Sequence, residues 1–296
     1  MLNQIKNFIL HLRLHYQFFI LSGGYLLGGL MADEMNTTQF WLQFLNVHVL
    51  LFGGATAYNS FWDKDEGPIG GLKNPPKMQP WMHKLSLLFM FAGWAWAFTI
   101  SFIYFLIFGV SLLFFWLYST PHARWKGRPV ASMTAIAVST GTNSVLLGYW
   151  AAGGIFTAEL LFASIGAALI LLSLYPISQI YQLEEDTRRG DITFTKKVGL
   201  AGVKRFFRYS YLAGLILLTI GFFVMYPIPA IALFITALLS FAMLNGFVSG
   251  LEGIIEEYPV VMKIKFMASL AFVLFLIAAN AVRYDWIGDT FLRGYF

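Results

Sequence analysis

Two short acidic segments contain the residue types that bind a divalent cation. In each, an amide and a carboxylate are four residues apart, Asn59 with Asp63 and Gln182 with Asp186. Residues i and i+4 share a helix face, so each pair projects together. Mg²⁺ prefers oxygen ligands and typically takes one or two carboxylates with waters and phosphates. We therefore predict a Mg²⁺ site built from Asn59, Asp63, Gln182 and Asp186, helped by Glu185, with Asp63 and Asp186 as its essential carboxylates.

The two acidic segments also share a sequence pattern. Each contains Tyr, then Asn or Gln, then three residues, then Asp, beginning at Tyr58 and at Tyr181. A repeat at equivalent positions of the chain predicts two similar halves of about four helices each. The alternative is that both segments are solvated helix ends whose charges serve solubility alone.

A basic loop supplies cations suited to a phosphate. Arg124, Lys126 and Arg128 fall within five residues. Arg offers a fork of donors and Lys a compact charge, and together they can clamp a phosphate. We predict that these three, with Lys64 or Lys73, bind a diphosphate. The alternative is that they only mark the cytoplasmic side of a membrane.

Together these residues suggest ionisation of a prenyl diphosphate. Metal and cations stabilise the leaving diphosphate, and a dry apolar pocket protects the resulting carbocation from water. Tyr58 and Tyr181, beside the motifs, are candidates to line that pocket, although packing alone explains most aromatic residues. His48 and Asn143 are polar residues inside apolar segments and are further pocket candidates. Their alternative roles are a hydrogen-bonded histidine within the bundle and an asparagine that links helices.

Composition identifies the elements that must position these groups. The chain has 296 residues, of which 58% are apolar and 12% charged, and no cysteine. A soluble domain is about 25% charged, so this composition predicts an all-α, polytopic membrane protein. Absence of cysteine excludes disulfides, thiolate nucleophiles and Cys–metal sites. The net charge of +5 would suit nucleic acid, but the positions of the cations favour membrane orientation, and we expect no nucleic-acid partner.

Nine apolar segments are long enough to cross a bilayer, which takes about 20 residues. The run from Leu85 to Tyr118 is too long for one crossing and is divided near Thr99–Ser101. We expect one domain over residues 1–296, formed by the two halves and a ninth helix. The predicted spans are 15–32, 38–60, 84–100, 101–119, 130–150, 156–180, 205–225, 228–248 and 263–283.

This nine-span arrangement separates the charges. Eighteen of the 20 Lys and Arg residues fall on one side, and Arg283 and Arg293 on the other. Because cation-rich loops stay in the cytoplasm, we predict a multi-pass protein of the cell membrane with a cytoplasmic N-terminus, an outside C-terminus and a site near the cytoplasmic face. No small-residue cleavage site follows the short apolar run between Lys6 and Arg13, so we expect no signal peptide.

The motifs resemble those of the UbiA superfamily of intramembrane prenyltransferases. That family has an Asn-Asp-x-x-Asp-x-x-x-Asp pattern and a later Asp-x-x-x-Asp pattern. This chain keeps Asn59, Asp63 and Asp186, but has Ser60, Gly67 and Gln182 at carboxylate positions. The loop 118–129 is similar to that of the chlorophyll synthase and homogentisate prenyltransferase branch, and the stretch 190–199 also resembles the family.

The resemblance implies a nine-helix, Mg²⁺-dependent enzyme of isoprenoid biosynthesis. It would transfer a polyprenyl group from its diphosphate to an aromatic or other hydrophobic acceptor among the membrane lipids. The missing carboxylates imply weaker Mg²⁺ binding or shifted ligands such as Glu185 or Asp65. Asp191 is the candidate to deprotonate the acceptor. Two alternatives remain: a UbiA-type terpene cyclase that needs no acceptor, and a non-enzymatic transporter.

Overall fold

The computed structural model describes residues 2–288 and 291–296, with the side chains of Phe291 and Arg293 outside the description. Helices dominate the described residues, and pairing of extended backbone is limited there to one isolated bridge between Ile69 and Leu72. Within the described residues the helices form nine rods, some of them built from several segments, and the short 3₁₀ turn η7 follows the ninth rod. The first four rods are α1 (Leu2–Leu12) with α2 (Leu14–Tyr16), η1 (Gln17–Leu21) and α3 (Ser22–Met31); α4 (Thr37–Leu45) with η2 (Asn46–Gly53) and α5 (Gly54–Asp63); α6 (Pro80–Ala97); and α7 (Phe102–Ser119). The fifth rod consists of η3 (Trp125–Gly127), α8 (Pro129–Ile136), η4 (Ala137–Thr142) and α9 (Asn143–Ala152), and the sixth of α10 (Ala158–Leu174), η5 (Pro176–Gln182) and α11 (Leu183–Arg188). The last three rods are α12 (Phe194–Met225), α13 (Pro227–Ser249), and η6 (Ile255–Glu257) with α14 (Tyr258–Arg283), after which comes η7 (Phe291–Tyr295).

The predicted spans are confirmed as helical rods. Seven helices of the described chain are long and apolar enough to cross a membrane, and the first rod and α6 match the other two predicted spans. The long apolar run does divide near Thr99–Ser101. Helix α6 ends at Ala97, and the Ser101 side chain caps α7 by accepting a hydrogen bond from the Tyr104 amide at 3.1 Å.

Several boundaries differ from the prediction. The first rod begins at Leu2 instead of residue 15, α12 at Phe194 instead of 205, and α14 at Tyr258 instead of 263. The extra turns of the first rod and of α12 contain several polar residues, which a hydropathy criterion does not detect, whereas the added residues 258–262 of α14 are mostly apolar. Within the added turns of α12 the helix is interrupted at Gly199, whose φ of 68° few other residues adopt easily.

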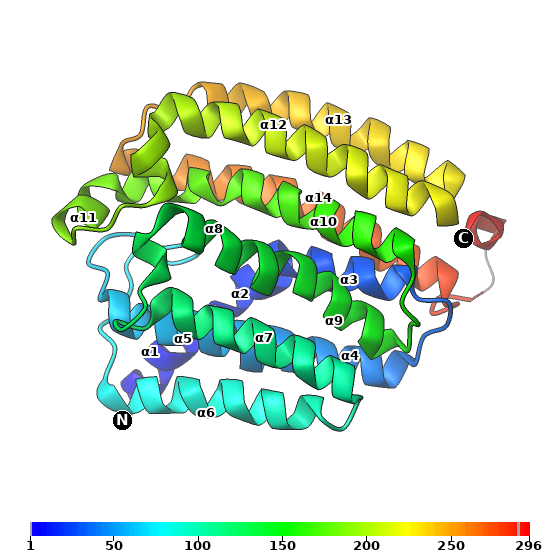
Figure 1. Ribbon diagram of the computed structural model, residues 1–296, viewed down its shortest axis with the longest axis horizontal. Helices are drawn as coiled ribbons and strands as arrows, with labels where there is room; N and C mark the ends of the chain where they lie inside the picture. Colours follow the sequence, from blue (N-terminus) through cyan, green and yellow to red (C-terminus); the bar gives the residue numbers. More distant parts are fainter. Residues whose placement is uncertain (1, 289–290) are drawn as a thin grey trace.

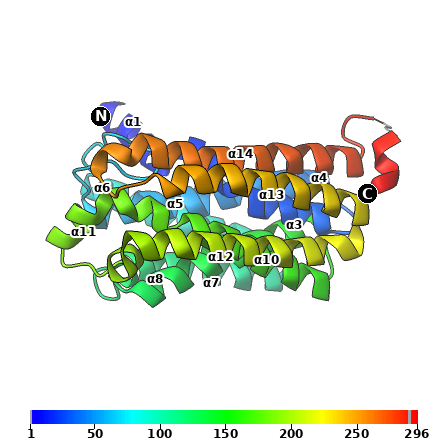
Figure 2. The same cartoon turned by 90° about the horizontal axis from the view of Figure 1, so that it is seen from above.

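The rods lie side by side, with the two chain ends at opposite ends of the bundle (Figures 1 and 2). This placement agrees with an odd number of crossings. In Figure 1, α12 and α13 form one edge and α6 the other. Helix α11 lies at the same end of the bundle as the N-terminus in both views.

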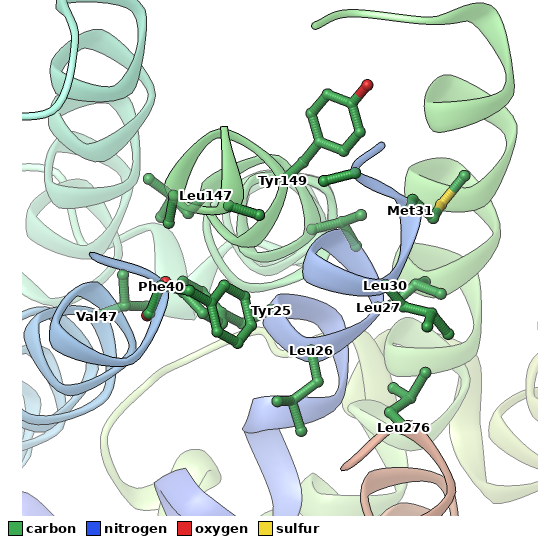
Figure 3. Close-up of a cluster of buried hydrophobic side chains, with 14 of the residues drawn as sticks. Tyr25, Leu26, Leu27, Leu30, Met31, Phe40, Val47, Leu147, Tyr149 and Leu276 are labelled. Carbon is green, nitrogen blue, oxygen red and sulfur yellow. The ribbon is translucent and has the colours of Figure 1, made fainter. Parts of the chain in front are cut away.

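Helix α3 lies at the centre of the apolar core (Figure 3). Tyr25 and Leu27 are fully buried there against side chains of neighbouring rods. Helices α3 and α9 cross closely because both carry glycine at the contact. A Cβ added at Gly28 would lie 2.0 Å from the Val145 carbonyl oxygen, and one at Gly148 would lie 1.9 Å from that of Tyr25. Such small-residue crossings are typical of helix packing in membranes.

Three rods contain a π-helical stretch, namely η1, η2 and η4. π-Helical turns are rare and often mark functional sites. Each of these stretches contributes to the cavity described below, through Gln17, Phe52 and Thr140 respectively. The widened turns therefore surround one interior space.

Candidate active site

The first acidic segment ends α5 at a cavity of about 200 Å³. Asn59 and Asp63 both line it, as expected from their four-residue spacing on one helix. Lys64 adopts a left-handed conformation with φ of 50° and ends the helix directly after Asp63. The Asn59 amide donates a hydrogen bond to Ser119 Oγ at 3.2 Å, which leaves its carbonyl oxygen available.

The second acidic segment reaches the same cavity. Pro176 begins the 3₁₀ turn η5, and the chain then continues as α11, which places Gln182 and Asp186 on the cavity wall. Asp186 is 2% exposed. Within the described residues its carboxylate has no hydrogen bond or ion pair. The predicted convergence of Asp63 and Asp186 is therefore present in the structure.

The basic loop places Lys126 against the first acidic segment. Lys126 Nζ lies 2.6 Å from Asp63 Oδ2, and both side chains are buried. Burial lowers the pKa of Lys126, but Asp63, Asp65 and Asp186 outweigh it and raise the pKa above its usual value. Lys126 therefore stays charged inside the cavity.

Arg124 of the same loop is held by Asp191. Its Nε and Nη2 donate to the two Asp191 carboxylate oxygens at 2.8 and 2.7 Å. This bidentate pair places Arg124 Nη1 4.0 Å from Asp63 Oδ1. Neither Arg124 nor Asp191 is among the residues that line the cavity. Arg124 therefore approaches the site through Asp63, and the geometry gives Asp191 the role of positioning Arg124.

A second ion-pair group joins the two acidic segments. Arg189 donates to Asp65 at 2.7 Å and to Glu185 at 2.5 Å. The Glu185 carboxylate also accepts a hydrogen bond from the Glu66 amide at 3.1 Å. Burial raises the pKa of Asp65 and nearby Asp63 adds to this, while Lys126 and Arg189 oppose it. Arg189 thus ties the loop after α5 to α11.

Other predicted site residues lie away from the cavity. Lys64, Lys73 and Arg128 are exposed and are absent from its lining. Tyr58 is buried and stacks on the His83 ring, with 5.2 Å between centroids. The structure thus brings neither the three exposed cations nor Tyr58 to the cavity.

The two intramembrane polar residues have structural partners. His48 Nδ1 lies 2.7 Å from the Phe44 carbonyl oxygen, and the imidazole packs among aromatic rings. Asn143 links two rods by donating to Ser111 Oγ at 2.9 Å. Neither lines the cavity, whereas Tyr181 does.

Arg13, Tyr16 and Lys265 are among the cavity residues that escaped the sequence prediction. The two cations were assigned only to membrane orientation. A lysine beside the apolar run of α14 is a signal for function, because charges inside a bilayer are costly and usually serve a site.

The polar cavity continues into an apolar one of about 370 Å³ between α3, α10, α12, α13 and α14. Ile20, Leu174 and Ser269 line both. The second cavity is walled mainly by aliphatic side chains, including Leu215, and by Phe272. The arrangement can hold a molecule with a charged head and an apolar tail.

The residues fit a Mg²⁺ ion that takes some of its ligands from the protein and the others from a bound substrate. No group of three His, Asp or Glu side chains in the described chain is arranged to hold a metal alone. However, Asp63 Oδ1 is buried without a hydrogen bond, and the Asp186 carboxylate has no ion pair. Mg²⁺ commonly takes one or two carboxylates and completes its shell with phosphates and water, which suits this donor set.

The fold is that of UbiA homologues. A UbiA homologue from Archaeoglobus fulgidus bound to GPP and Mg²⁺ superposes with a TM-score of 0.72 at 16% identity, covering 93% of this chain and 100% of the other. The same homologue bound to DMAPP and Mg²⁺ gives 0.69, with 93% and 99% covered. A structure described as digeranylgeranylglyceryl phosphate synthase in membranes gives 0.62 at 19% identity, with 93% and 99% covered.

The sequence itself matches no protein-family model and no curated protein sequence. At these identities the structural likeness establishes the UbiA-like fold of a multi-pass membrane protein. It agrees with the expected all-helical, nine-rod architecture.

Proposed function

We propose that this chain is a Mg²⁺-dependent, UbiA-type prenyltransferase, which transfers a prenyl group from its diphosphate to a hydrophobic acceptor within the membrane. The observation that carries the proposal is the convergence of Asp63, Asp186 and Lys126 on one cavity that continues into an apolar one. The structures of similar fold with bound GPP or DMAPP and Mg²⁺ support this class of donor.

Each group has a defined task in the proposed reaction. Asp63 and Asp186 would hold Mg²⁺, with the side-chain carbonyl oxygens of Asn59 and Gln182 beside them. Bound Mg²⁺ would neutralise the diphosphate and so favour its departure. Lys126 adds a permanent positive charge close to the same anion, and Arg124, held by Asp191, adds a second.

The apolar cavity would hold the prenyl chain and exclude water from the allylic carbon. Phe52, Phe115 and Tyr181 line the polar cavity, and aromatic rings are suited to stabilise positive charge on carbon. The acceptor must reach the same space. Since Arg124 occupies both oxygens of Asp191, we assign no acceptor deprotonation to that carboxylate.

Asp186→Asn is the decisive variant, because it removes a carboxylate that forms no ion pair within the described residues and should leave the fold intact. We expect turnover of geranyl or geranylgeranyl diphosphate with Mg²⁺ to fall at least about 100-fold, the size of a lost electrostatic contact to a transition state. Glu184→Gln, an exposed acid two residues away, is the matched control and should keep full activity. Equal activity of both variants would refute the role of Asp186.

The products separate the related functions. Transfer requires an acceptor, whereas a cyclase converts the donor alone into a cyclic hydrocarbon or alcohol. A transporter would move substrate across proteoliposomes without releasing diphosphate. Screening of hydrophobic acceptors with donor and Mg²⁺ therefore distinguishes all three.

We further propose that the site faces the cytoplasm of a cell membrane. The cation-rich connections lie at the end of the bundle where the two acidic segments meet. Because the chain has no cysteine, single-cysteine labelling has no background. Lys73→Cys should react only after the membrane is permeabilised, and Ile155→Cys, at the opposite end, in intact cells. The reverse pattern would refute this orientation.

A further inference from the structure

Two cations of α12 meet the end of α13 outside both cavities. Lys204 Nζ donates a hydrogen bond to the Ser249 carbonyl oxygen at 2.7 Å. Arg208 donates from Nε to Asn245 Oδ1 at 2.8 Å and from Nη2 to Ser249 Oγ at 3.1 Å. Residues i and i+4 share a helix face, so both cations point to the same turn of α13. None of these four residues lines either cavity.

No carboxylate neutralises these two cations within the described part of the chain. The nearest acids in the sequence of α13 and α14 lie in the connection between them. Glu257 there accepts hydrogen bonds from the Glu252 and Gly253 amides, each at 2.7 Å. Glu252 and Glu256 are exposed, and neither forms an ion pair among the described residues. The positive charge at the end of α13 is therefore available to an external anion.

The cations lie at the level where a bilayer changes from hydrocarbon to headgroups. Arg208 is 17 residues before Met225, the last residue of α12, and Asn245 is 18 residues after Pro227, the first of α13. At 1.5 Å per residue these positions are about 26 and 27 Å from the outer ends of their helices. The hydrocarbon core is about 30 Å thick, so Arg208 reaches the inner boundary of that core.

The surface beside these cations faces lipid. Helices α12 and α13 form one edge of the bundle (Figure 1). Apolar side chains are exposed along both helices, including Ile216 and Leu239, and Tyr209 directly after Arg208 is 70% exposed. Exposed apolar surface of this extent is typical of a membrane contact. Acyl chains would therefore lie against this edge, with their headgroups at the level of Arg208.

Helix capping accounts for only part of this arrangement. A cation near the C-terminus of a helix stabilises its free carbonyl groups, which explains the bond from Lys204 to the Ser249 carbonyl oxygen. Arg208 instead bonds two side chains, and these fix its guanidinium at the edge of the bundle. Arg has five N–H donors and Lys three, so after the printed contacts three and two donors remain. A fixed guanidinium beside an ammonium is suited to bind a phosphate.

We propose that Arg208 and Lys204 bind the headgroup phosphate of an anionic phospholipid, with Asn245 and Ser249 holding the guanidinium in place. The lipid belongs to the leaflet on the side of the two acidic segments. Basic pockets between transmembrane helices on the cytoplasmic side are known to bind anionic headgroups. This site is independent of the proposed catalysis, because it shares no residue with either cavity.

Lipid binding to the purified, delipidated chain in a neutral detergent tests the proposal. Phosphatidylglycerol and phosphatidylcholine would be added at equal concentrations, and the bound lipids counted by native mass spectrometry. We expect tighter binding of phosphatidylglycerol. Arg208→Gln should weaken it at least about fivefold, the effect of one basic residue at an anionic headgroup, and should leave phosphatidylcholine unchanged.

Lys263→Gln is the matched control, because it removes the same charge from the same end of the bundle. Lys263 is exposed, lies 20 residues before the end of α14, and is placed 5.4 Å from the centroid of the Phe247 ring. Successive residues of a helix are 100° apart, so Phe247 and Ser249 lie on opposite sides of α13. Lys263→Gln should therefore retain the affinity for phosphatidylglycerol.

Asn245→Ala tests whether the guanidinium must be held in place. This variant keeps every charge and removes one of the two side chains that fix Arg208. It should weaken phosphatidylglycerol at least about twofold, the size of one lost hydrogen bond. A purely electrostatic attraction would leave the affinity unchanged, and that result would overturn the proposed site. Asn245→Ala also carries the test if Arg208→Gln fails to give the thermal unfolding midpoint of the natural chain.

Three other results would overturn the proposal. The first is equal binding of phosphatidylglycerol and phosphatidylcholine by the natural chain. The second is an equal loss in Arg208→Gln and Lys263→Gln, which would indicate general attraction to positive charge. The third is displacement of phosphatidylglycerol by the same concentration of inorganic phosphate, which would indicate a site for a soluble anion.

Discussion

The ion pair between Asp63 and Lys126 allows a quantitative test of how this cavity is held together. The side chains are 2% and 9% exposed, and Lys126 Nζ lies 2.6 Å from Asp63 Oδ2. Asp63→Asn leaves the ammonium buried without a full counter-charge, and Lys126→Met leaves the carboxylate with only Arg124 at 4.0 Å. Removing one partner of a buried pair typically costs about 3–5 kcal/mol.

The double variant Asp63→Asn/Lys126→Met should be destabilised by much less than the sum of the single changes, because neither charge is then left alone. We expect a coupling energy of about 2–3 kcal/mol, the range for residues in one buried network. Each single change should lower the midpoint of thermal unfolding by about 6–10 °C, taking about 2 °C per kcal/mol, the lower end of the range for 150–250 residues, for this longer chain.

Thermal unfolding of the four proteins in one detergent, followed by circular dichroism, measures this cycle. Lys64→Met is the matched control, since Lys64 follows Asp63 directly but is exposed, and it should shift the midpoint little. Single effects that simply add would show that the two side chains do not interact. All activity should be lost in Asp63→Asn and should not return in the double variant, because stability and metal binding are separate properties of Asp63.

Three further predictions follow from other contacts. Asp65 lines the cavity, and burial raises its pKa, so its negative charge near the proposed Mg²⁺ should be present above that raised pKa and lost on acidification. The loss of Mg²⁺ affinity on acidification should be smaller in Asp65→Asn, and an identical profile would show that Asp65 does not act on the ion. Asn143→Ala should reduce the free energy of unfolding by about 1 kcal/mol through loss of a hydrogen bond, while Mg²⁺-dependent turnover stays unchanged. A large loss of turnover would instead indicate that Asn143 contacts a substrate. Gly148→Ala should prevent folding, because its Cβ would lie 1.9 Å from the Tyr25 carbonyl oxygen. The control Gly246→Ala, with no atom within 4 Å of the added Cβ, should yield normal amounts of monodisperse protein. Equal yields of the two variants would contradict this packing.

Local periodicity was sufficient to predict much of the site. The four-residue spacing places Asn59 with Asp63, and Gln182 with Asp186, on the same cavity wall. Lys126, which the basic loop suggested as a diphosphate ligand, also lines that cavity. In contrast, its neighbour Arg128 in the same loop points to solvent, and only the path of the loop distinguishes the two.

Only some of the residues predicted for the pocket line the cavity, and the reason is physical. Tyr181 faces the cavity, whereas His48 and Asn143 satisfy their hydrogen bonds within and between neighbouring rods. A polar residue in an apolar segment signals that some partner exists, but the sequence does not contain the rotation of its helix about the axis. That rotation is decided by packing, such as the close crossing of α3 and α9.

The sequence by itself determined the membrane class, the nine rods and the pairing of carboxylates with amides, because these depend on composition and on spacing within one helix. Only the tertiary structure decided that Arg13 and Lys265 share the cavity with Asp63 and Asp186, and that Asp191 instead holds Arg124. These residues come from rods far apart in the chain, and their meeting depends on how side chains of different helices pack. The distribution of cations between the two sides explained Arg13 and Lys265 by membrane orientation alone, and only the folded bundle shows that both are buried at the cavity.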